Sequence, residues 1–278
     1  MDWEQAFLSQ MNLADDLDNE MSKRYKEEYL DARNDIMAWC EAYGVSYSDS
    51  RKILNHDDLI AFRDQLEIYM DDNVSDVWKK KLLVMASRSR VSRIEELELK
   101  LRHGCEKTFF QLFTSLLSLL FDSSDYYGDF TLSKLDGDTH YKGYEETDKI
   151  DGMTLKERVE YNKSKLISEL NRELVMGLVR GESGRKISSR VKERLRVSES
   201  RTKNISQTSE SWVLNDVQSN VMKAMKVKLY KISAFLDGRT CQHCRTMNGK
   251  IFNLSDLEVG VNAPPFHNNC RCIKIPVR

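Results

Sequence analysis

The sequence predicts a predominantly α-helical α+β protein, and three observations lead to this prediction. All three prolines of the 278 residues lie at or after Pro264, so nothing before that point interrupts a helix in the way proline does. Apolar residues make up 40% and charged residues 31% of the composition, and they recur in the three- and four-residue steps of amphipathic helices. After Lys228 the pattern changes to alternation, which is typical of strands.

The first 121 residues are expected to form an N-terminal helical domain. Helices are predicted over residues 2–43, 57–70, 75–104 and a fourth segment that contains the apolar run 109–121. Gly44 and Gly104 are natural stops, and Asp57 is a possible N-cap. The apolar run is shorter than the roughly 20 residues that a membrane span requires, so it is interpreted as a buried helix.

Residues 122–153 are interpreted as a linker. Aspartate, glycine, serine and tyrosine replace the helical pattern there, as in "DSSDYYGDF", and Asp136-Gly137 suggests a hairpin. Helical periodicity returns at Thr154, which forms a capping box with Glu157, and the helix that follows is expected to end at Gly181.

The third predicted region, residues 154–278, combines helices with a small sheet. Two more helices are expected within 183–227, and a β module over 229–278 follows them. Within that module Asn248-Gly249 indicates a tight turn, and Pro276 places the last strand at an edge.

The net charge of −1 conceals an asymmetry along the chain. Residues 1–153 carry 19 Lys and Arg against 32 Asp and Glu, whereas residues 154–278 carry 24 against 12. The C-terminal part should therefore attract polyanions and the N-terminal part repel them. The beginning of the chain, "MDWEQAFLSQMNLADD", is acidic where a secretory signal would be basic. We expect a protein of the cytosol that makes no membrane contact.

A dense group of metal-ligand residue types occupies the C-terminal β module. "CQHC" supplies Cys241 and Cys244, and "HNNCRC" supplies His267, Cys270 and Cys272. Zinc takes four such ligands in a tetrahedron, so the two clusters could complete one site. The four thiolates form one possible set, and His267 in place of Cys272 forms another, while free thiols and disulfides remain alternatives. Because protein would fill all four positions, such a zinc ion would be structural rather than catalytic.

The C-terminal half also resembles a known family. The strings "DGRTCQHCRTMNGKIF" and "PPFHNNCRC", preceded by "LVRGESGRKISSRV" and "RTKNISQTSESWVLNDV", are similar to the phage Mu protein F-like minor head proteins, also called the phage head morphogenesis family. The resemblance covers roughly residues 150–278. It implies a non-enzymatic structural protein of a tailed phage, located inside the virion head near the portal vertex and in the host cytoplasm during assembly.

The resemblance also implies partners and a role. Contacts with the portal protein and with the major capsid protein are expected, and the role would lie in head assembly, DNA packaging or DNA delivery. Some relatives are thought to contact DNA, and residues 154–203 of this chain hold 14 basic residues against 7 acidic ones, a composition that suits nonspecific phosphate contacts. The candidate DNA-binding residues are Arg185, Lys186, Arg190, Lys192, Arg194 and Arg196.

Two other function classes remain as alternatives. His267 followed by Asn268 and Asn269 suggests a metal-dependent nuclease, although a second histidine or an acidic partner is missing from the neighbouring sequence. A zinc-containing DNA-binding regulator is the other alternative, although neither a recognition-helix module nor a dimerising heptad is visible. A charged face that only solvates the protein would explain the basic residues equally well.

Overall fold

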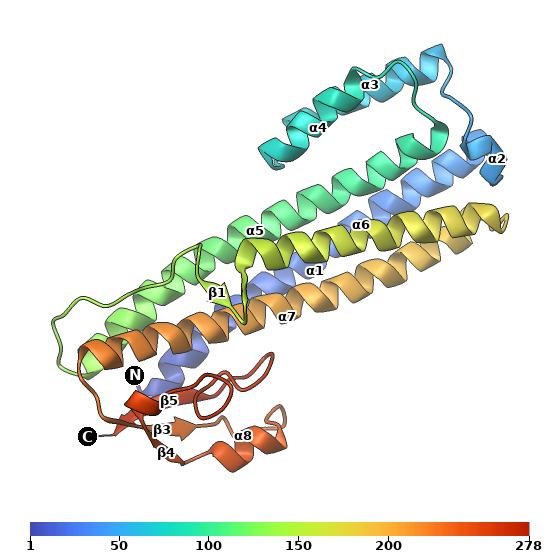
Figure 1. Ribbon diagram of the computed structural model, residues 1–278. Coiled ribbons are helices and arrows are strands. Elements are labelled where there is room, and N and C mark those ends of the chain that lie inside the picture. The colour runs from blue at the N-terminus through green and yellow to red at the C-terminus, as the bar shows by residue number, and fades with distance from the viewer. Residues whose placement is uncertain (278) are drawn as a thin grey trace. The chain divides into compact units, whose positions relative to one another are not determined.

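The structure is a computed structural model that describes residues 1–277, and it is mainly helical with small antiparallel sheets, as predicted (Figure 1). The long helices are α1 (Trp3–Tyr43), α5 (Arg93–Lys134), α6 (Leu155–Val179) and α7 (Gly184–Ala224), and the short ones are α2 (Tyr47–Ser50), α3 (His56–Asp71), α4 (Asp76–Ala86) and α8 (Gln242–Met247). The strands are β1 (Lys149–Ile150), β2 (Met153–Thr154), β3 (Leu229–Ser233), β4 (Ile251–Asn253) and β5 (Ile273–Val277), and a 3₁₀ turn, η1, covers Leu254–Asp256.

The chain divides into two compact units that do not follow its linear order. The first unit contains Met1–Asn19, Ser115–Arg158 and Thr202–Arg278, and the second contains Glu20–Thr114 and Val159–Arg201. Each of the four long helices has a part in each unit. The predicted boundaries at residues 121 and 153 therefore divide the chain differently from the packing, and cutting the chain at residue 121 would remove parts of both units.

Two predicted helix boundaries are wrong, one because a local cap divides the segment and one because a glycine serves packing. The segment 75–104 is not one helix: α4 ends at Ala86, and a new helix begins after Ser92, whose hydroxyl and backbone N–H form a capping box with Glu95. Gly104 does not end that helix. The Glu28 carboxylate lies so close to it that a Cβ there would approach Glu28 Oε1 to 2.1 Å, so the glycine provides space for a packed neighbour.

The predicted linker is partly helical and its hairpin lies elsewhere. Helix α5 continues to Lys134, well past residue 121. The hairpin is formed by β1 and β2 around Asp151-Gly152, both with positive φ, rather than at Asp136-Gly137. The capping box at Thr154 is confirmed, since Thr154 N donates to Glu157 Oε2 at 2.8 Å and Glu157 N donates to Thr154 Oγ1 at 3.2 Å.

The first unit ends in the three-stranded antiparallel sheet β4-β3-β5. Pro276 lies on the edge strand β5, opposite Tyr230 of the central strand, as predicted. The turn at Asn248-Gly249 connects α8 to β4 and does not join two strands directly, because residues 242–247 form a helical turn. A core of small and sulfur-containing side chains fills the space beneath the sheet, among them Met222, Ile232, Met247 and Cys244.

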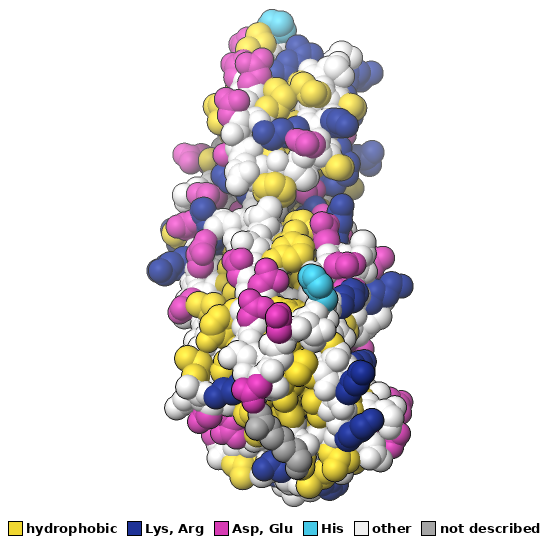
Figure 2. Space-filling model, turned by 90° about the vertical axis from the view of Figure 1, so that its left-hand side faces the viewer, with side chains coloured by type: hydrophobic (Ala, Val, Ile, Leu, Met, Phe, Trp, Pro, Cys, Tyr) yellow, Lys and Arg dark blue, Asp and Glu magenta, His cyan; other side chains and the backbone are white. Residues whose placement is uncertain are grey.

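The second unit has its own core between α3, α4 and the first turns of α5. Phe62, Leu66, Trp78, Leu82 and Leu99 are buried there together. On the face displayed in Figure 2, acidic and basic side chains are interspersed with exposed apolar ones. Among residues 1–277, no helix combines sufficient length with sufficient apolar character to cross a bilayer.

Candidate metal centre

The first pair of candidate ligands lies at the start of α8. Cys241 is the N-cap of this helix, and its Sγ accepts a hydrogen bond from the backbone N–H of Cys244 at 3.4 Å. Asp237 fixes the preceding turn by accepting from Arg239 N and by forming a two-pronged ion pair with Arg271, both oxygens at 2.7 Å. The ion pair holds the pKa of Asp237 down at about 2. It ties the turn that carries the first ligands to the loop that carries the second group.

The second group lies in the loop before β5. The backbone N–H of Cys270 donates to the carbonyl of His267 at 3.1 Å, and Asn269 adopts a positive φ of 59° within this turn. The imidazole Nδ1 of His267 lies 2.7 Å from the carbonyl oxygen of Asn268. Because a carbonyl only accepts, Nδ1 carries a proton, and in the neutral imidazole Nε2 then presents its lone pair. This is the arrangement that orients histidine ligands in metal sites.

The structure brings all five predicted ligand residues together. His267 Nε2 lies 3.2 Å from the sulfur of Cys241 and 3.2 Å from that of Cys244, and the sulfurs of Cys244 and Cys270 are 3.8 Å apart. The ligand atoms form two groups, Cys241 with Cys244 and His267, and Cys244 with Cys270 and Cys272, each within 4.8 Å. Cys244 belongs to both groups. This cluster could hold a metal ion.

The sulfur spacing suits a metal better than a disulfide. A tetrahedral zinc ion with bonds of about 2.3 Å to sulfur places neighbouring sulfurs about 3.8 Å apart, whereas a disulfide would bring them to about 2.05 Å. All six cysteines are free thiols in the structure. A cavity of about 20 Å³ lies among Cys241, Cys244, His267 and Cys272, which is large enough for one small ion or water molecule.

The thiols are poised to share one negative charge. The pKa of Cys270 is lowered because its sulfur accepts hydrogen bonds from the Cys244 and Cys272 thiols, and the pKa values of those two donors are raised by the same bonds and by burial. The backbone N–H of Cys244 lowers the pKa of Cys241. Burial lowers the pKa of His267, but its bond to Asn268 and the nearby cysteines outweigh this and raise it. A metal ion would replace these shared protons.

Polar residues of α7 hold the second ligand loop, and the sequence analysis missed them. Thr208 Oγ1 accepts from Asn269 N at 3.1 Å, Ser211 Oγ donates to the Cys270 carbonyl at 2.5 Å, and Asn215 Nδ2 donates to the Cys272 carbonyl at 3.1 Å. These three residues share one helix face at steps of three and four. The available signal was the polar spacing Thr208, Ser211 and Asn215 within "TSESWVLN", three positions that are buried in the structure.

Asn215 is expected to act as a positioning residue for the metal ligands. Replacing it by alanine leaves the Cys272 carbonyl and the buried Lys274 ammonium, 3.0 Å from Asn215 Oδ1, without their side-chain partner. We expect the Asn215→Ala chain to bind zinc about 10- to 100-fold more weakly, measured by competition with a chromophoric chelator. Asn220→Ala is the matched control on the same helix, since Asn220 bonds the Lys142 carbonyl instead. Equal affinities of the two variants would contradict this role.

The six predicted DNA-binding residues all lie on α7, but internal carboxylates pair with most of them. Arg190 and Arg194 contact Glu173, and Arg190 and Lys186 contact Glu182. The other pairs and contacts are Arg196 with Glu193 at 3.1 Å and Lys192 over the ring of Tyr29 at 5.0 Å, while Arg185 is exposed. These contacts weaken the positive field of the stripe, and DNA binding by these residues stays a prediction.

Fold and site together define a mainly helical α+β protein with a small sheet module closed by cysteine and histidine. The family model "Phage Mu protein F like protein" matches residues 168–275, which include the C-terminal part of α6, all of α7 and all five candidate ligands. The match confirms the resemblance for this part of the chain, and the family suggests a phage head morphogenesis protein. No curated protein and no solved structure matched the chain.

Proposed function

We propose that the chain is a structural minor head protein of a tailed phage whose C-terminal module is closed by zinc. One observation carries the proposal: five metal-ligand side chains from two separate loops converge inside the segment that matches the family. The strands of the module have only three to five residues, and sheets this small rarely persist by burial alone. A structural metal supplies the missing stability.

The donor chemistry favours zinc over Mg²⁺ and Ca²⁺. Thiolates and an imidazole bind Zn²⁺ well, whereas Mg²⁺ and Ca²⁺ prefer oxygen ligands. Cys241, Cys244 and His267 form three positions of the proposed tetrahedron, because His267 Nε2 is equidistant from both sulfurs and its ring is held by Asn268. Cys270 or Cys272 supplies the fourth. This set includes the histidine, and ligand sets with and without it were both left open by the sequence.

The geometry favours a structural role over the nuclease alternative. A general base needs a free nitrogen directed at a water molecule. Both ring nitrogens of His267 are already engaged, Nε2 with two sulfurs and Nδ1 with a carbonyl. We therefore propose a non-enzymatic protein that resides in the virion head and contacts the portal protein or the major capsid protein.

Incorporation into heads tests this function. The full chain is expressed together with the portal and major capsid proteins of the same phage, and heads are isolated by sedimentation. We expect the chain to co-sediment with the heads in few copies per head. A Cys241→Ser variant should co-sediment in much smaller amount, because the C-terminal module without its metal loses the folded surface that contacts the head proteins. Cys40→Ser is the control, since Cys40 is a half-buried thiol far along the chain from the cluster. Heads that never contain the wild-type chain would refute the proposal.

A further inference from the structure

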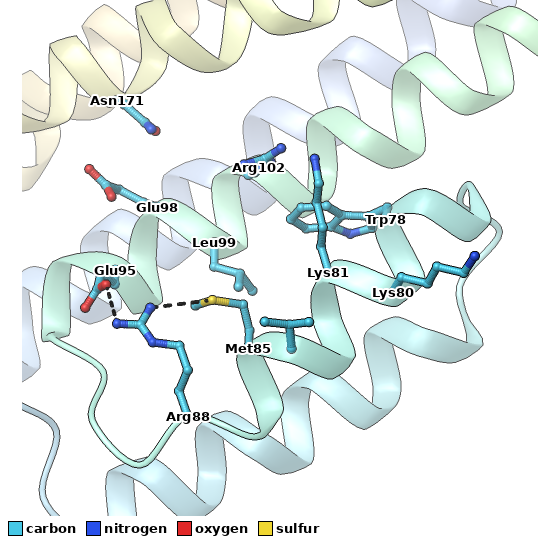
Figure 3. A pocket seen from close by; sticks show the side chains of 11 residues that line it. Trp78, Lys80, Lys81, Met85, Arg88, Glu95, Glu98, Leu99, Arg102 and Asn171 are labelled. Atoms are coloured by element: carbon cyan, nitrogen blue, oxygen red, sulfur yellow. Dashed lines mark hydrogen bonds and ion pairs between the residues drawn. The ribbon is translucent and has the colours of Figure 1, made fainter.

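A large pocket lies in the second unit between α4 and α5, with Asn171 of α6 at its margin (Figure 3). Its volume is about 490 Å³, within the range of pockets that accept ligands or inserted side chains. The walls combine apolar side chains with basic ones. Trp78, Val84, Met85 and Leu99 form the apolar part, and Val84 exposes 65% of its surface.

Basic side chains border this pocket. Lys80, Lys81, Arg88 and Arg102 all line it, and Figure 3 shows Arg88 held by Glu95 and by Met85. No carboxylate within residues 1–277 forms an ion pair with Lys80 or Lys81. The segment 79–93 contains six basic residues and no acidic one, although the first 153 residues as a whole are acidic. Arg88 pairs with Glu95 and Arg93 lies over the Tyr43 ring, so Lys80 and Lys81 are the basic residues of the pocket whose charge is left to an external partner.

The two helices present matching stripes to the pocket. On α4, Lys81 and Val84 lie three residues apart, with Arg88 just beyond the end of the helix, and on α5 Glu95, Leu99 and Arg102 recur at steps of four and three. Residues at such spacing face one side of a helix. The pocket is thus a groove with an apolar floor and charged margins, which is the form that receives an amphipathic helix. The apolar lining formed by Trp78, Val84, Met85 and Leu99 suits inserted apolar side chains better than a nucleic-acid phosphate as the occupant.

We propose that this groove binds an amphipathic helix of a partner protein, whose apolar residues fill the pocket and whose acidic residues pair with Lys80 and Lys81. Helix α4 has 11 residues, so a partner helix of about three to four turns would match its length. The inference does not depend on the metal centre or on the assignment to phage heads. It stands on the groove and its charge alone.

A defined peptide tests the proposal with the full-length chain. The probe is a fluorescein-labelled 16-residue helical peptide with leucines at positions i, i+3, i+4 and i+7 and glutamates beside them. Fluorescence anisotropy is expected to show binding in about the micromolar range. A peptide with lysine in place of every glutamate should bind at least about tenfold more weakly. Equal binding of the two peptides, or failure of the acidic one to bind, overturns the proposal.

Two neighbouring substitutions on α4 form the matched pair. Val84→Asp introduces a charge into the groove, whereas Leu83→Asp introduces the same charge at a side chain that is 56% exposed but lies outside the pocket lining. We expect Val84→Asp to weaken peptide binding at least about tenfold and Leu83→Asp to leave it within about twofold. Equal effects of the two would overturn the proposal. Displacement of the peptide by a DNA duplex would also overturn the proposal, because DNA would then be the occupant of the groove. A dimer of the chain that is lost only in Val84→Asp would overturn it as well, because a second copy would then be the occupant.

Discussion

A Cys244→Ser variant is expected to keep its long helices but to lose bound metal and the stable structure of residues 229–277. Cys244 is the one thiol shared by both ligand groups, and its side chain is only 3% exposed. A serine hydroxyl is a poor zinc ligand, so the ion would lose the position that joins the two loops. Zinc binding to such small modules contributes several kcal/mol of folding free energy. The apolar packing of the small sheet is too limited to replace this lost stabilisation.

Two measurements follow the Cys244→Ser variant. Metal content by mass spectrometry should fall to background, and amide hydrogen exchange should accelerate in residues 229–277 while the long helices stay protected. The Cys40→Ser chain is the control for the loss of a thiol as such, and it should retain metal and protection. Unchanged exchange in the Cys244→Ser module would show that burial alone stabilises it.

The second large effect is expected at His103, a buried residue of α5 in the other unit. Its ring is 3% exposed and lies stacked on Tyr69, with centroids 3.7 Å apart. His103 Nδ1 accepts from Trp78 Nε1 at 3.0 Å, and Nε2 lies 2.7 Å from Asp72 Oδ2. An indole N–H only donates, so Nδ1 must be unprotonated and the imidazole neutral. Replacing His103 by alanine would leave the buried indole N–H of Trp78 on α4 unsatisfied and create a cavity beside Tyr69 of α3, at a cost of about 3 kcal/mol.

The same geometry predicts how stability depends on pH. Burial lowers the pKa of His103, against the opposing influence of Asp72, and Lys107 lowers it further while Glu106 raises it. The unfolded chain therefore binds a proton on this histidine more readily than the folded chain does. Its contribution to stability is complete above the unfolded pKa of about 6.5 and is lost as the pH falls toward the lower folded value.

The Trp78→Phe variant distinguishes the contribution of His103 to the pH dependence of stability from the contributions of other titrating groups. Without the indole donor, the imidazole can accept a proton on Nδ1 and face Asp72 as a cation, so the pKa of His103 should rise. We expect Trp78→Phe to unfold about 1–2 kcal/mol more easily at pH 8 but to lose less stability than the wild type between pH 7 and pH 5.5. Urea titrations at these pH values measure both, with the exposed His140→Ala chain as the control. Parallel pH profiles of wild type and Trp78→Phe would contradict the assignment.

The sequence predicted helix ends correctly where a residue within one turn of the end caps the helix. The stop at Gly44 and the capping box at Thr154 and Glu157 are seen in the structure, because caps are satisfied by residues within one turn. Gly104 could not be interpreted in this way. Whether a glycine ends a helix or admits a neighbour depends on a distant residue, here Glu28. The end of α5 at Lys134 is local instead, since Asp136 adopts a positive φ and Gly137 N donates to the Leu132 carbonyl at 3.1 Å.

The composition of the candidate site was predictable, but its arrangement was not. Spacing alone identified Cys241, Cys244, His267, Cys270 and Cys272 as possible ligands, since each type is a good zinc donor. The orientation of His267 depends on a carbonyl bond within its turn, and the position of its loop depends on a polar face of α7. Both are consequences of tertiary structure. The ion pairs that occupy the basic stripe of α7 were hidden for the same reason.

Metal content of the purified full-length chain tests the central claim most directly. After expression in zinc-containing medium and dialysis, we predict one zinc per chain. Replacement by Co²⁺ should give the sulfur-to-metal charge-transfer band of three thiolates, and either Cys270→Ser or Cys272→Ser, but not both, should reduce its intensity. A chain that contains no zinc and whose cysteines in residues 241–272 all react freely with a thiol reagent would contradict the account.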